Sequence, residues 1–275
     1  MPCTTFQQLS VRTWGRMQNN LNTPILLRED GITSLNLQDI YNNLKKDILV
    51  IDFSPQVESS TTGADWEWWF LSKSGAFGAA VQAKCLSSKN TYDVGYTPKK
   101  SGYPQIERLL DYSVANDITP MYCFYNWFSS IPTGVSWPCG SFPQKDDLWG
   151  CALTDAWTIY SYHLKSQYSA NVYLSFSEPW HCLTCCQPSG AELGSRAFAV
   201  AKRLVNKGRT SSATDYPTIY KQTDIRSPII HKSLPDRVSK LIQMGRNENI
   251  DHAIGEMKEN MPRRLVLMGD INLYI

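Results

Sequence analysis

The sequence lacks several features that would place it in a special class of protein. None of its 275 residues fall in an apolar run of the roughly 20 positions needed to cross a bilayer. The first residues lack the basic and apolar regions of a secretory signal. No internal repeat, low-complexity segment or glycine-rich phosphate loop is found, which argues against a repeat architecture and against ATP-driven chemistry. We therefore expect a cytoplasmic protein that does not bind membranes.

An excess of charge of one sign is also missing. The formal net charge is +2, charged residues make up 19% of the chain, and hydrophobic residues make up 42%. This composition excludes an intrinsically disordered chain and is typical of a folded globular protein. A small net charge does not exclude a nucleic-acid partner, because such binding depends on a local basic patch.

The pattern of apolar residues predicts a mixed α/β fold. Expected helices cover residues 5–20, 35–46 and 103–116, and expected strands cover residues 48–53, 64–70, 77–84 and 118–127. Thr33 or Ser34 is the expected N-cap of the second helix. From residue 35 onward the order is helix, three strands, helix, strand, which predicts a mixed sheet flanked by helices.

The second half of the chain has a less regular pattern. We expect helices at residues 152–167, 191–206 and 234–244, and strands at residues 172–176, 224–232 and 264–268. Residues 1–130 are interpreted as a core. Residues 131–275 are interpreted as a C-terminal α/β extension that continues that core or packs on it.

Polar side chains lie on the predicted hairpin of residues 64–84, where a buried face is expected. Side chains two positions apart on a strand share a face, so Asp65 and Glu67 project together, as do Gln82 and Lys84. Aligned strands would bring two carboxylates, an amide oxygen and an ammonium to one place. Oxygen ligands suit Mg²⁺, which polarises a phosphoryl oxygen and activates water, while a lysine stabilises developing charge. A cross-strand ion pair on a solvated face is the structural alternative.

These residues carry a resemblance to a known family. Gly63-Ala64-Asp65, a strand, a turn and then Val81-Gln82-Ala83-Lys84 resemble the motif of the PD-(D/E)xK nuclease superfamily. The chain is most similar to the Mrr-like branch of restriction-endonuclease-like proteins, in which Gln replaces the acidic residue of the second motif (QxK). The likeness covers roughly residues 30–127, and over the whole chain it is to uncharacterised bacterial members.

The resemblance implies a fold and a set of site residues. The fold would be a restriction-endonuclease-like core of the order αβββαβ. Asp65 would be the principal metal ligand, Gln82 would contribute a ligand oxygen, and Lys84 would be the catalytic lysine. Gln105, at the start of the following helix, matches a Gln that often faces the site in this family.

A further carboxylate is expected near this set. Members often add a Glu from the preceding helical region, and both Glu29 and Glu58 are candidates. No Pro precedes Asp65, and the Gln of the second motif is a weaker ligand than Glu. Metal binding would then depend more on Asp65, Glu67 and Glu58.

The resemblance also implies an activity. It indicates a Mg²⁺- or Mn²⁺-dependent endonuclease that hydrolyses phosphodiester bonds, with double-stranded DNA as the preferred substrate. Bacterial enzymes of this kind commonly defend against foreign DNA, a role compatible with a homodimer or with partner proteins of a defence system. The alternatives are an RNase or toxin with the same site, and a non-catalytic nucleic-acid-binding protein with a nuclease-like fold.

A basic stretch near residue 205 is a candidate nucleic-acid contact. It ends a predicted helix and would contact phosphates beside the cleft, although a solvated helix face is the alternative. Its residues are Lys202, Arg203, Lys207 and Arg209.

Eight cysteines lie at irregular positions, and in a reducing compartment we expect thiols or metal ligands rather than disulfides. Cys182 and Cys185 have the spacing of a zinc knuckle, which Cys139 or Cys151 would complete. A strong zinc signature has a second Cys-x-x-Cys or a paired His, and the sequence has neither. Buried free thiols beside Trp180 are therefore favoured over a structural Zn²⁺ site.

Overall fold

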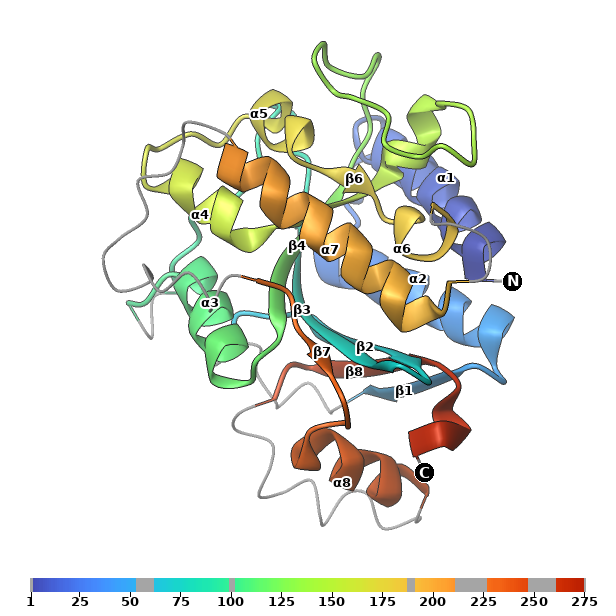
Figure 1. The fold of residues 1–275 in the computed structure, drawn as a ribbon. Coiled ribbons are helices and arrows are strands. Elements are labelled where there is room, and N and C mark those ends of the chain that lie inside the picture. The colour runs from blue at the N-terminus through green and yellow to red at the C-terminus, as the bar shows by residue number, and fades with distance from the viewer. Residues whose placement is uncertain are drawn as a thin grey trace.

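The computed structural model describes residues 2–52, 62–98, 102–186, 191–210, 227–246 and 261–274. Its centre is one open mixed sheet of eight strands, covered by helices on both faces (Figure 1). The strands are β1 (Ile48–Asp52), β2 (Trp66–Ser72), β3 (Gly75–Cys85), β4 (Thr119–Tyr125), β5 (Cys151–Asp155), β6 (Glu178–Pro179), β7 (Ile230–His231) and β8 (Arg264–Gly269).

The strands do not follow one another across the sheet in chain order. Their spatial order is β1-β8-β2-β3-β4-β5-β6, and β7 pairs with β3. The pairs β2–β8 and β3–β4 are parallel, whereas the other pairs are antiparallel. Because β8 lies between β1 and β2, a strand from the C-terminal part of the chain is an internal strand of the sheet.

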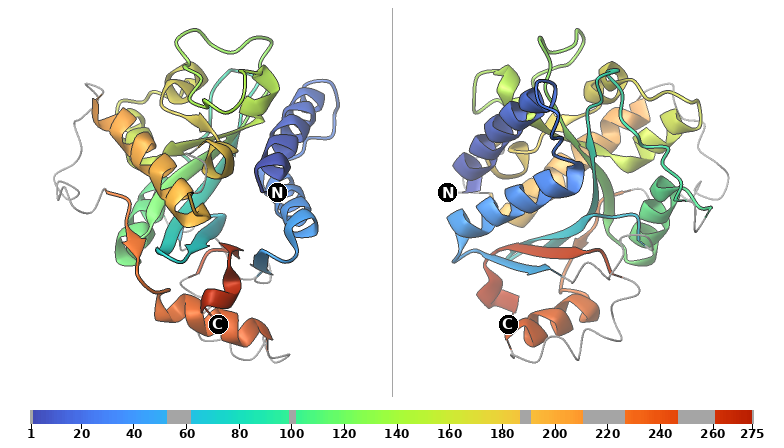
Figure 2. Two further views of the ribbon diagram at one scale, coloured as in Figure 1. Left: turned by 45° about the vertical axis from the view of Figure 1, so that its right-hand side comes forward. Right: turned by 180° about the vertical axis from the view of Figure 1, so that it is seen from behind.

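Helices form a layer on each face. They are α1 (Pro2–Asn20), α2 (Glu29–Leu44), α3 (Gln105–Ala115), α4 (Ala156–His163), α5 (Ala170–Ser175), α6 (Cys182–Cys185), α7 (Leu193–Thr210) and α8 (Asp236–Arg246), with 3-10 turns η1 (Asp146–Gly150) and η5 (Ile271–Tyr274). Buried residues of α3, α4, α5 and α8 share one hydrophobic cluster, and those of α1, α2, α6 and α7 share another. Figure 2 shows α1 and α2 together on one side of the sheet.

The hairpin of β2 and β3 is buried on both faces. Trp66, Trp68 and Phe70 pack under α1, α2 and α7, while Trp69 and Leu71 point to the opposite layer. This alternation explains why an almost continuous aromatic run forms a central strand. Trp66 and Trp68 are therefore core residues.

The predicted α/β class and the order of the first half are confirmed. The elements α2, β1, β2, β3, α3 and β4 follow the expected order of helix, three strands, helix and strand. The helix predicted at 103–116 corresponds to α3, whose buried residues include Ile106, Leu109, Leu110 and Ser113. The helices predicted at 191–206 and 234–244 and the strand at 264–268 correspond to α7, α8 and β8.

The predicted start of the second helix is wrong. α2 begins at Glu29, so Thr33 and Ser34 lie inside it instead of capping it. The Thr33 hydroxyl is 2.8 Å from the Tyr125 hydroxyl, and Ser34 Oγ donates to the carbonyl of Asp30 at 2.8 Å. Both hydroxyls therefore have hydrogen-bond partners other than the backbone N–H groups that an N-cap would accept from.

Three predicted elements of the second half differ from the structure. Residues 152–155 belong to β5, which pairs with β4, and the helix starts only at Ala156. Asp155 is its N-cap, since Oδ2 accepts from the backbone N–H of Thr158 at 2.9 Å. Residues 172–175, predicted as strand, lie in α5. The strand predicted at 224–232 is reduced to Ile230–His231, and its first three residues lie outside the described ranges.

The proposed extension shares the sheet of the core. Residues 131–275 supply β5, β6, β7 and β8, so no boundary between sheets falls at residue 130. Across the described ranges, no helix has both the length and the apolar content that a bilayer crossing requires.

Candidate active site

A glycine turn places Asp65 at the start of β2. Gly63 has φ +69°, and a Cβ at this position would lie 2.4 Å from the carbonyl oxygen of Gln105 and 2.6 Å from the amide nitrogen of Leu109. Only glycine combines this backbone conformation with so close an approach to another backbone. The turn therefore brings the strand carrying Asp65 directly against the beginning of α3.

Asp65 is tied to β3 by two hydrogen bonds. Its backbone N–H donates to the carbonyl of Val81 at 2.8 Å, and its Oδ2 accepts from the N–H of Ala83 at 2.7 Å. No hydrogen bond to Oδ1 is made by any residue that the structure describes. The carboxylate is therefore held beside Gln82 and Lys84 with one oxygen available.

Lys84 and Gln105 meet beside this carboxylate. Lys84 is 6% exposed, and its Nζ donates to Oε1 of Gln105 at 3.0 Å. The Lys84 Nζ also lies 5.8 Å from the centre of the Tyr96 ring, which is half exposed. The ammonium is thus held in a fixed position at the end of β3, where the sheet meets α3.

Gln82 is buried without hydrogen-bond partners. Its side chain is 0% exposed, and neither Oε1 nor Nε2 is bonded within the described ranges. Tyr122, its neighbour in register on β4, also has a buried hydroxyl that finds no partner among the residues the structure describes. An unpaired buried polar group costs about 1–3 kcal/mol. Several such groups beside Asp65 mark a place built for a ligand, an ion or water.

The electrostatic surroundings of Asp65 contain both signs of charge. Burial raises the pKa of its carboxyl to about 6, although the side chain keeps partial solvent exposure. The hydrogen bond from Ala83 and the positive charges of Lys84 and Arg264 lower this pKa, whereas the negative charge of Glu29 raises it. A cation bound here would favour the ionised carboxylate.

Of the three glutamates proposed to complete the site, Glu29 fits best. It is the first residue of α2, keeps partial exposure, and lies within electrostatic range of Asp65 and Cys85. Glu58 lies outside the described residues.

The expectation for Glu67 has to be corrected. It shares a face with Lys84, but it is fully buried in a separate network. Its oxygens accept from Arg237 of α8 at 2.8 and 3.1 Å, from the Tyr112 hydroxyl at 2.5 Å, and from Nε1 of Trp69. These donors occupy both carboxylate oxygens, so Glu67 is not available as a metal ligand.

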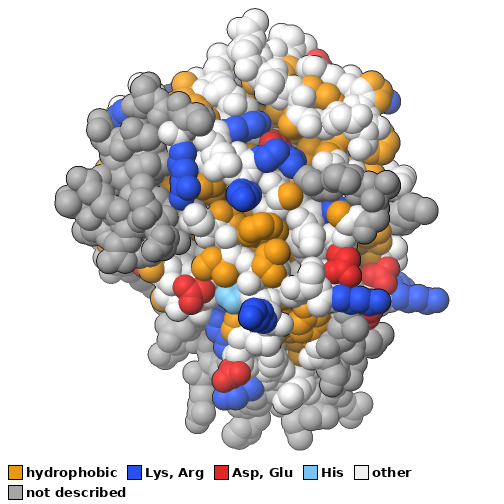
Figure 3. Space-filling model, in the orientation of Figure 1, with side chains coloured by type: hydrophobic (Ala, Val, Ile, Leu, Met, Phe, Trp, Pro, Cys, Tyr) orange, Lys and Arg blue, Asp and Glu red, His pale blue; other side chains and the backbone are white. Residues whose placement is uncertain are grey.

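Two of the four basic residues predicted to contact phosphates pair with a carboxylate of this chain instead. Arg203 and Lys207 lie 2.8 and 3.5 Å from the buried carboxylate of Glu178, so they mainly neutralise it. Lys202 and Arg209 are exposed, and Nη2 of Arg209 donates to Ser227 at 3.3 Å. Figure 3 shows basic side chains gathered over α7. Of the four residues predicted to contact phosphates, Lys202 and Arg209 are the exposed ones.

Arg264 and Tyr122 were missed in the sequence analysis. Arg264 lies at the start of β8 and is 2% exposed, and its Nη2 donates to Asp30 and Ser34 of α2 at 3.0 and 2.7 Å. Its Nη1 is buried without a partner among the described residues. An arginine opening an apolar strand was the only local signal. Its approach to Asp65 depends on the insertion of β8 beside β2, which no local pattern reveals.

The donor set fits a hard divalent cation. Asp65, Glu29 and the amide oxygen of Gln82 are oxygen ligands of the kind that Mg²⁺ and Mn²⁺ prefer. The orphaned Gln82 amide is the observation in favour of this fit, since an ion would supply the partner that it lacks. Lys84 lies beside these ligands with a charge that suits a phosphate group.

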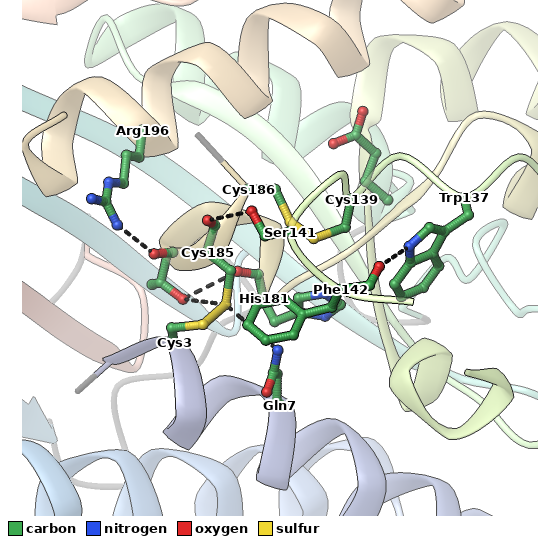
Figure 4. The surroundings of a disulfide bond; sticks show 12 residues. Cys3, Gln7, Trp137, Cys139, Ser141, Phe142, His181, Cys185, Cys186 and Arg196 are labelled. Carbon is green, nitrogen blue, oxygen red and sulfur yellow. Dashed lines mark hydrogen bonds between the residues drawn. A yellow bond between two sulfur atoms is a disulfide. The ribbon is translucent and has the colours of Figure 1, made fainter. Parts of the chain in front are cut away.

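The cysteines are arranged differently from the prediction. Cys3 and Cys185 form one disulfide, and Cys139 and Cys186 form another (Figure 4). The free-thiol expectation is therefore wrong for these four residues, because the fold brings distant segments to α6. Cys85, Cys123, Cys151 and Cys182 carry free thiols.

Comparison with known proteins gives a family without an assigned activity. No curated protein matches the chain. One family model, described as a family of unknown function (DUF6615), matches residues 2–269. This match spans nearly the whole sheet, including β8 and the residues around Asp65. The chain therefore belongs to the DUF6615 family.

Proposed function

We propose that this protein is a metal-dependent nuclease that hydrolyses phosphodiester bonds in nucleic acid, with double-stranded DNA as its preferred substrate. The observation that carries the proposal is the meeting of Asp65, Lys84 and Gln105, with a Lys84–Gln105 distance of 3.0 Å. The sequence resemblance to Mrr-like nucleases assigns roles to the same residues. Action in the cytoplasm against foreign DNA is part of this proposal.

Three residues would hold the ion. Asp65 offers Oδ1, Gln82 offers its unpaired amide oxygen, and Glu29 offers a carboxylate from α2. When bound, Mg²⁺ polarises a phosphoryl oxygen and lowers the pKa of a coordinated water.

The remaining residues would act on the phosphate and on the attacking water. Lys84 presents an ammonium that orients the water or stabilises charge developing on the phosphate. Gln105 holds this ammonium in place through the 3.0 Å hydrogen bond. Arg264 adds a fixed positive charge that favours the ionised form of Asp65.

A substrate comparison tests the proposal. Purified protein is incubated with supercoiled plasmid, linear duplex DNA and tRNA, each with Mg²⁺, with Mn²⁺ or with a chelator. We expect cleavage of duplex DNA that requires metal and that falls about 10²-fold or more in Asp65→Asn. Asp146→Asn, an exposed carboxylate away from the site, is the control and should cleave normally.

The other outcomes identify the alternatives. Cleavage of tRNA alone would indicate an RNase or toxin with the same site. Retained nucleic-acid binding without cleavage under any metal condition would indicate a non-catalytic binding protein. Equal cleavage by wild type and Asp65→Asn would show that Asp65 is not part of the catalytic site.

A further inference from the structure

We propose that the reduced protein binds one structural Zn²⁺ through Cys139, His181, Cys182 and Cys186. The three sulfur atoms and one ring nitrogen of His181 all lie within 4.8 Å of one another. This set differs from the knuckle considered from the sequence, because Cys185 points to Cys3 instead.

The distances are close to those of a zinc site. Zinc bonds of about 2.3 Å to sulfur and about 2.1 Å to nitrogen place tetrahedral ligands roughly 3.6–3.8 Å apart. Contraction from 4.8 Å by about 1 Å is within the reach of cysteine and histidine side-chain rotation.

His181 is the independent observation that points to a ligand. Its side chain is 0% exposed, and neither ring nitrogen has a hydrogen-bond partner within the described residues. Trp137 and Phe142 lie beside the ring, with centroids 5.6 and 6.4 Å away, and they offer it no strong acceptor. An enclosed imidazole without partners is costly, and a metal bond to one nitrogen removes part of that cost.

Two segments bring the ligands together. His181, Cys182 and Cys186 come from α6 and its flanks, where the four-residue separation of the two cysteines places them on one side of the turn. Cys139 comes from residues 126–145, which contain no helix or strand. Figure 4 shows Cys139 and His181 converging on this turn. The ion would therefore fasten a long irregular segment to the folded core.

The ligand chemistry selects the metal. Three thiolates and one imidazole form one of the common structural zinc sets, whereas iron–sulfur clusters usually need four thiolates. All four residues leave no open position for substrate, and Cys139 and Cys182 are 3% and 0% exposed. These features indicate a structural site.

Zinc binding and the Cys139–Cys186 disulfide exclude each other. A phosphine reductant supplies two electrons to the disulfide and takes an oxygen atom from water, which leaves two thiols and a phosphine oxide. Three thiols then lose three protons as Zn²⁺ binds, giving a site with net charge −1.

Metal analysis of the intact chain tests the proposal. The protein is purified without chelator in a phosphine reductant, and zinc, iron and copper are measured by elemental analysis. We expect about one Zn²⁺ per chain. After oxidation and dialysis, alkylation and mass spectrometry should detect the Cys139–Cys186 disulfide, and the zinc content should fall to near zero.

Variants distinguish this ligand set from the zinc knuckle of Cys182 and Cys185 that the sequence analysis considered. Cys182→Ser and Cys186→Ser should reduce zinc to less than about a tenth of the wild-type content. Cys185→Ser and Cys151→Ser, the matched controls, should keep the wild-type content. Because losing zinc also destabilises the fold, Co²⁺ is added to zinc-free, reduced wild type as a second measurement. Visible absorption bands of tetrahedral thiolate coordination are expected.

Three results would overturn the proposal. The first is a folded, reduced wild-type protein that contains no zinc and shows no Co²⁺ bands. The second is zinc retained in both Cys182→Ser and Cys186→Ser. The third is zinc lost from Cys185→Ser. None depends on nuclease activity, so this inference and the proposed function can fail separately.

Discussion

At the scale of single residues, the candidate site depends on a backbone turn as much as on its charged groups. Gly63 packs against the backbone at the start of α3, which brings Asp65 and Gln105 to adjoining positions. Asp65 and Lys84 are the fixed members of the set, since each is held by a hydrogen bond. Gln82 differs, because its buried side-chain amide has no hydrogen-bond partner in the described part of the chain.

Replacing Gly63 with alanine tests this turn. The new Cβ would meet backbone atoms at 2.4 and 2.6 Å in a residue of positive φ. We expect the free energy of unfolding, measured in urea, to fall by about 2–4 kcal/mol. Gly134→Ala is the control, because Gly134 has φ +89° but open space around it, and it should cost only about 1 kcal/mol. Equal losses in both variants would argue against close packing at Gly63.

Asp155 gives a pH dependence that its variant should remove. Burial raises the pKa of Asp155 to about 6 from 3.8, against the hydrogen bonds from Thr158. Between these values the folded protein binds more protons than the unfolded chain, so stability falls as pH rises from about 4 to 6. This contribution amounts to about 3 kcal/mol at most.

Asp155→Asn keeps the acceptor for Thr158 but cannot ionise. Urea unfolding at several pH values between 4 and 7 should therefore show a smaller decline in stability for this variant than for wild type. Parallel curves for the two proteins would contradict the raised pKa.

At the scale of elements, α8 is attached to the sheet by its apolar residues Val238, Leu241 and Ile242 and by an ion pair with a buried carboxylate. Arg237 is 19% exposed and Glu67 is fully buried, and the two groups are 2.8 Å apart. Breaking a buried pair by removing one partner leaves an uncompensated charge. This attachment also occupies both oxygens of Glu67, which are therefore not available to bind an ion.

A double-mutant cycle measures this attachment. Arg237→Met should lower the free energy of unfolding by about 3–5 kcal/mol, because the Glu67 carboxylate stays buried and loses its cation. The double variant Glu67→Gln/Arg237→Met should lose clearly less than the sum of the single losses. Additive losses would show that the pair is not coupled. If the double variant lost metal binding, Glu67 would have to be considered a metal ligand again.

Local patterns predicted the elements that carry the site. The spacing of Ile106 and Leu109 predicted α3, and the aromatic run after Asp65 predicted β2. Patterns failed where an apolar stretch is short, because residues 172–176 suit a strand or a helix equally. Tertiary contacts decide there, and Ala170 N–H donates to Asn90 at the entry to α5.

The partners of charged residues and cysteines were not predictable in the same way. Glu67 meets Arg237 across 170 residues, and Cys3 meets Cys185 across 182. Such pairs follow from how α8 and α6 pack on the sheet, which no sequence window contains. The choice of Glu29 over Glu67 therefore required the structure.

At the scale of the whole molecule, the two halves of the chain form one sheet. β8 pairs with β1 on one side and β2 on the other, through five residues on each side. The C-terminal residues are thus part of the core that positions Asp65. A core that ended at residue 130 would lack β8, the strand that pairs with β2 on the side away from β3.

Truncation tests this dependence. A chain ending at Arg246 lacks β8 and should not show cooperative unfolding by circular dichroism, because β1 and β2 lose their shared partner. A chain ending at Gly269 is the control, since it keeps β8 and loses mainly the contact of Tyr274 with Ser72. It should unfold cooperatively with a modest loss of stability. Cooperative unfolding of the shorter chain would show that the core folds without β8.

The proposed function of the whole molecule depends most directly on Lys84, which lies beside Asp65 and Gln82 on the hairpin of β2 and β3. Cleavage of supercoiled plasmid in Mg²⁺ or Mn²⁺ should be compared between wild type, Lys84→Met and Lys89→Met. Lys89 is exposed in the turn after β3 and serves as the matched control. We expect wild type and Lys89→Met to cleave alike and Lys84→Met to be slower by about 10²–10³-fold. Equal cleavage by all three folded proteins, or no metal-dependent cleavage by wild type, would contradict a nuclease site at Lys84.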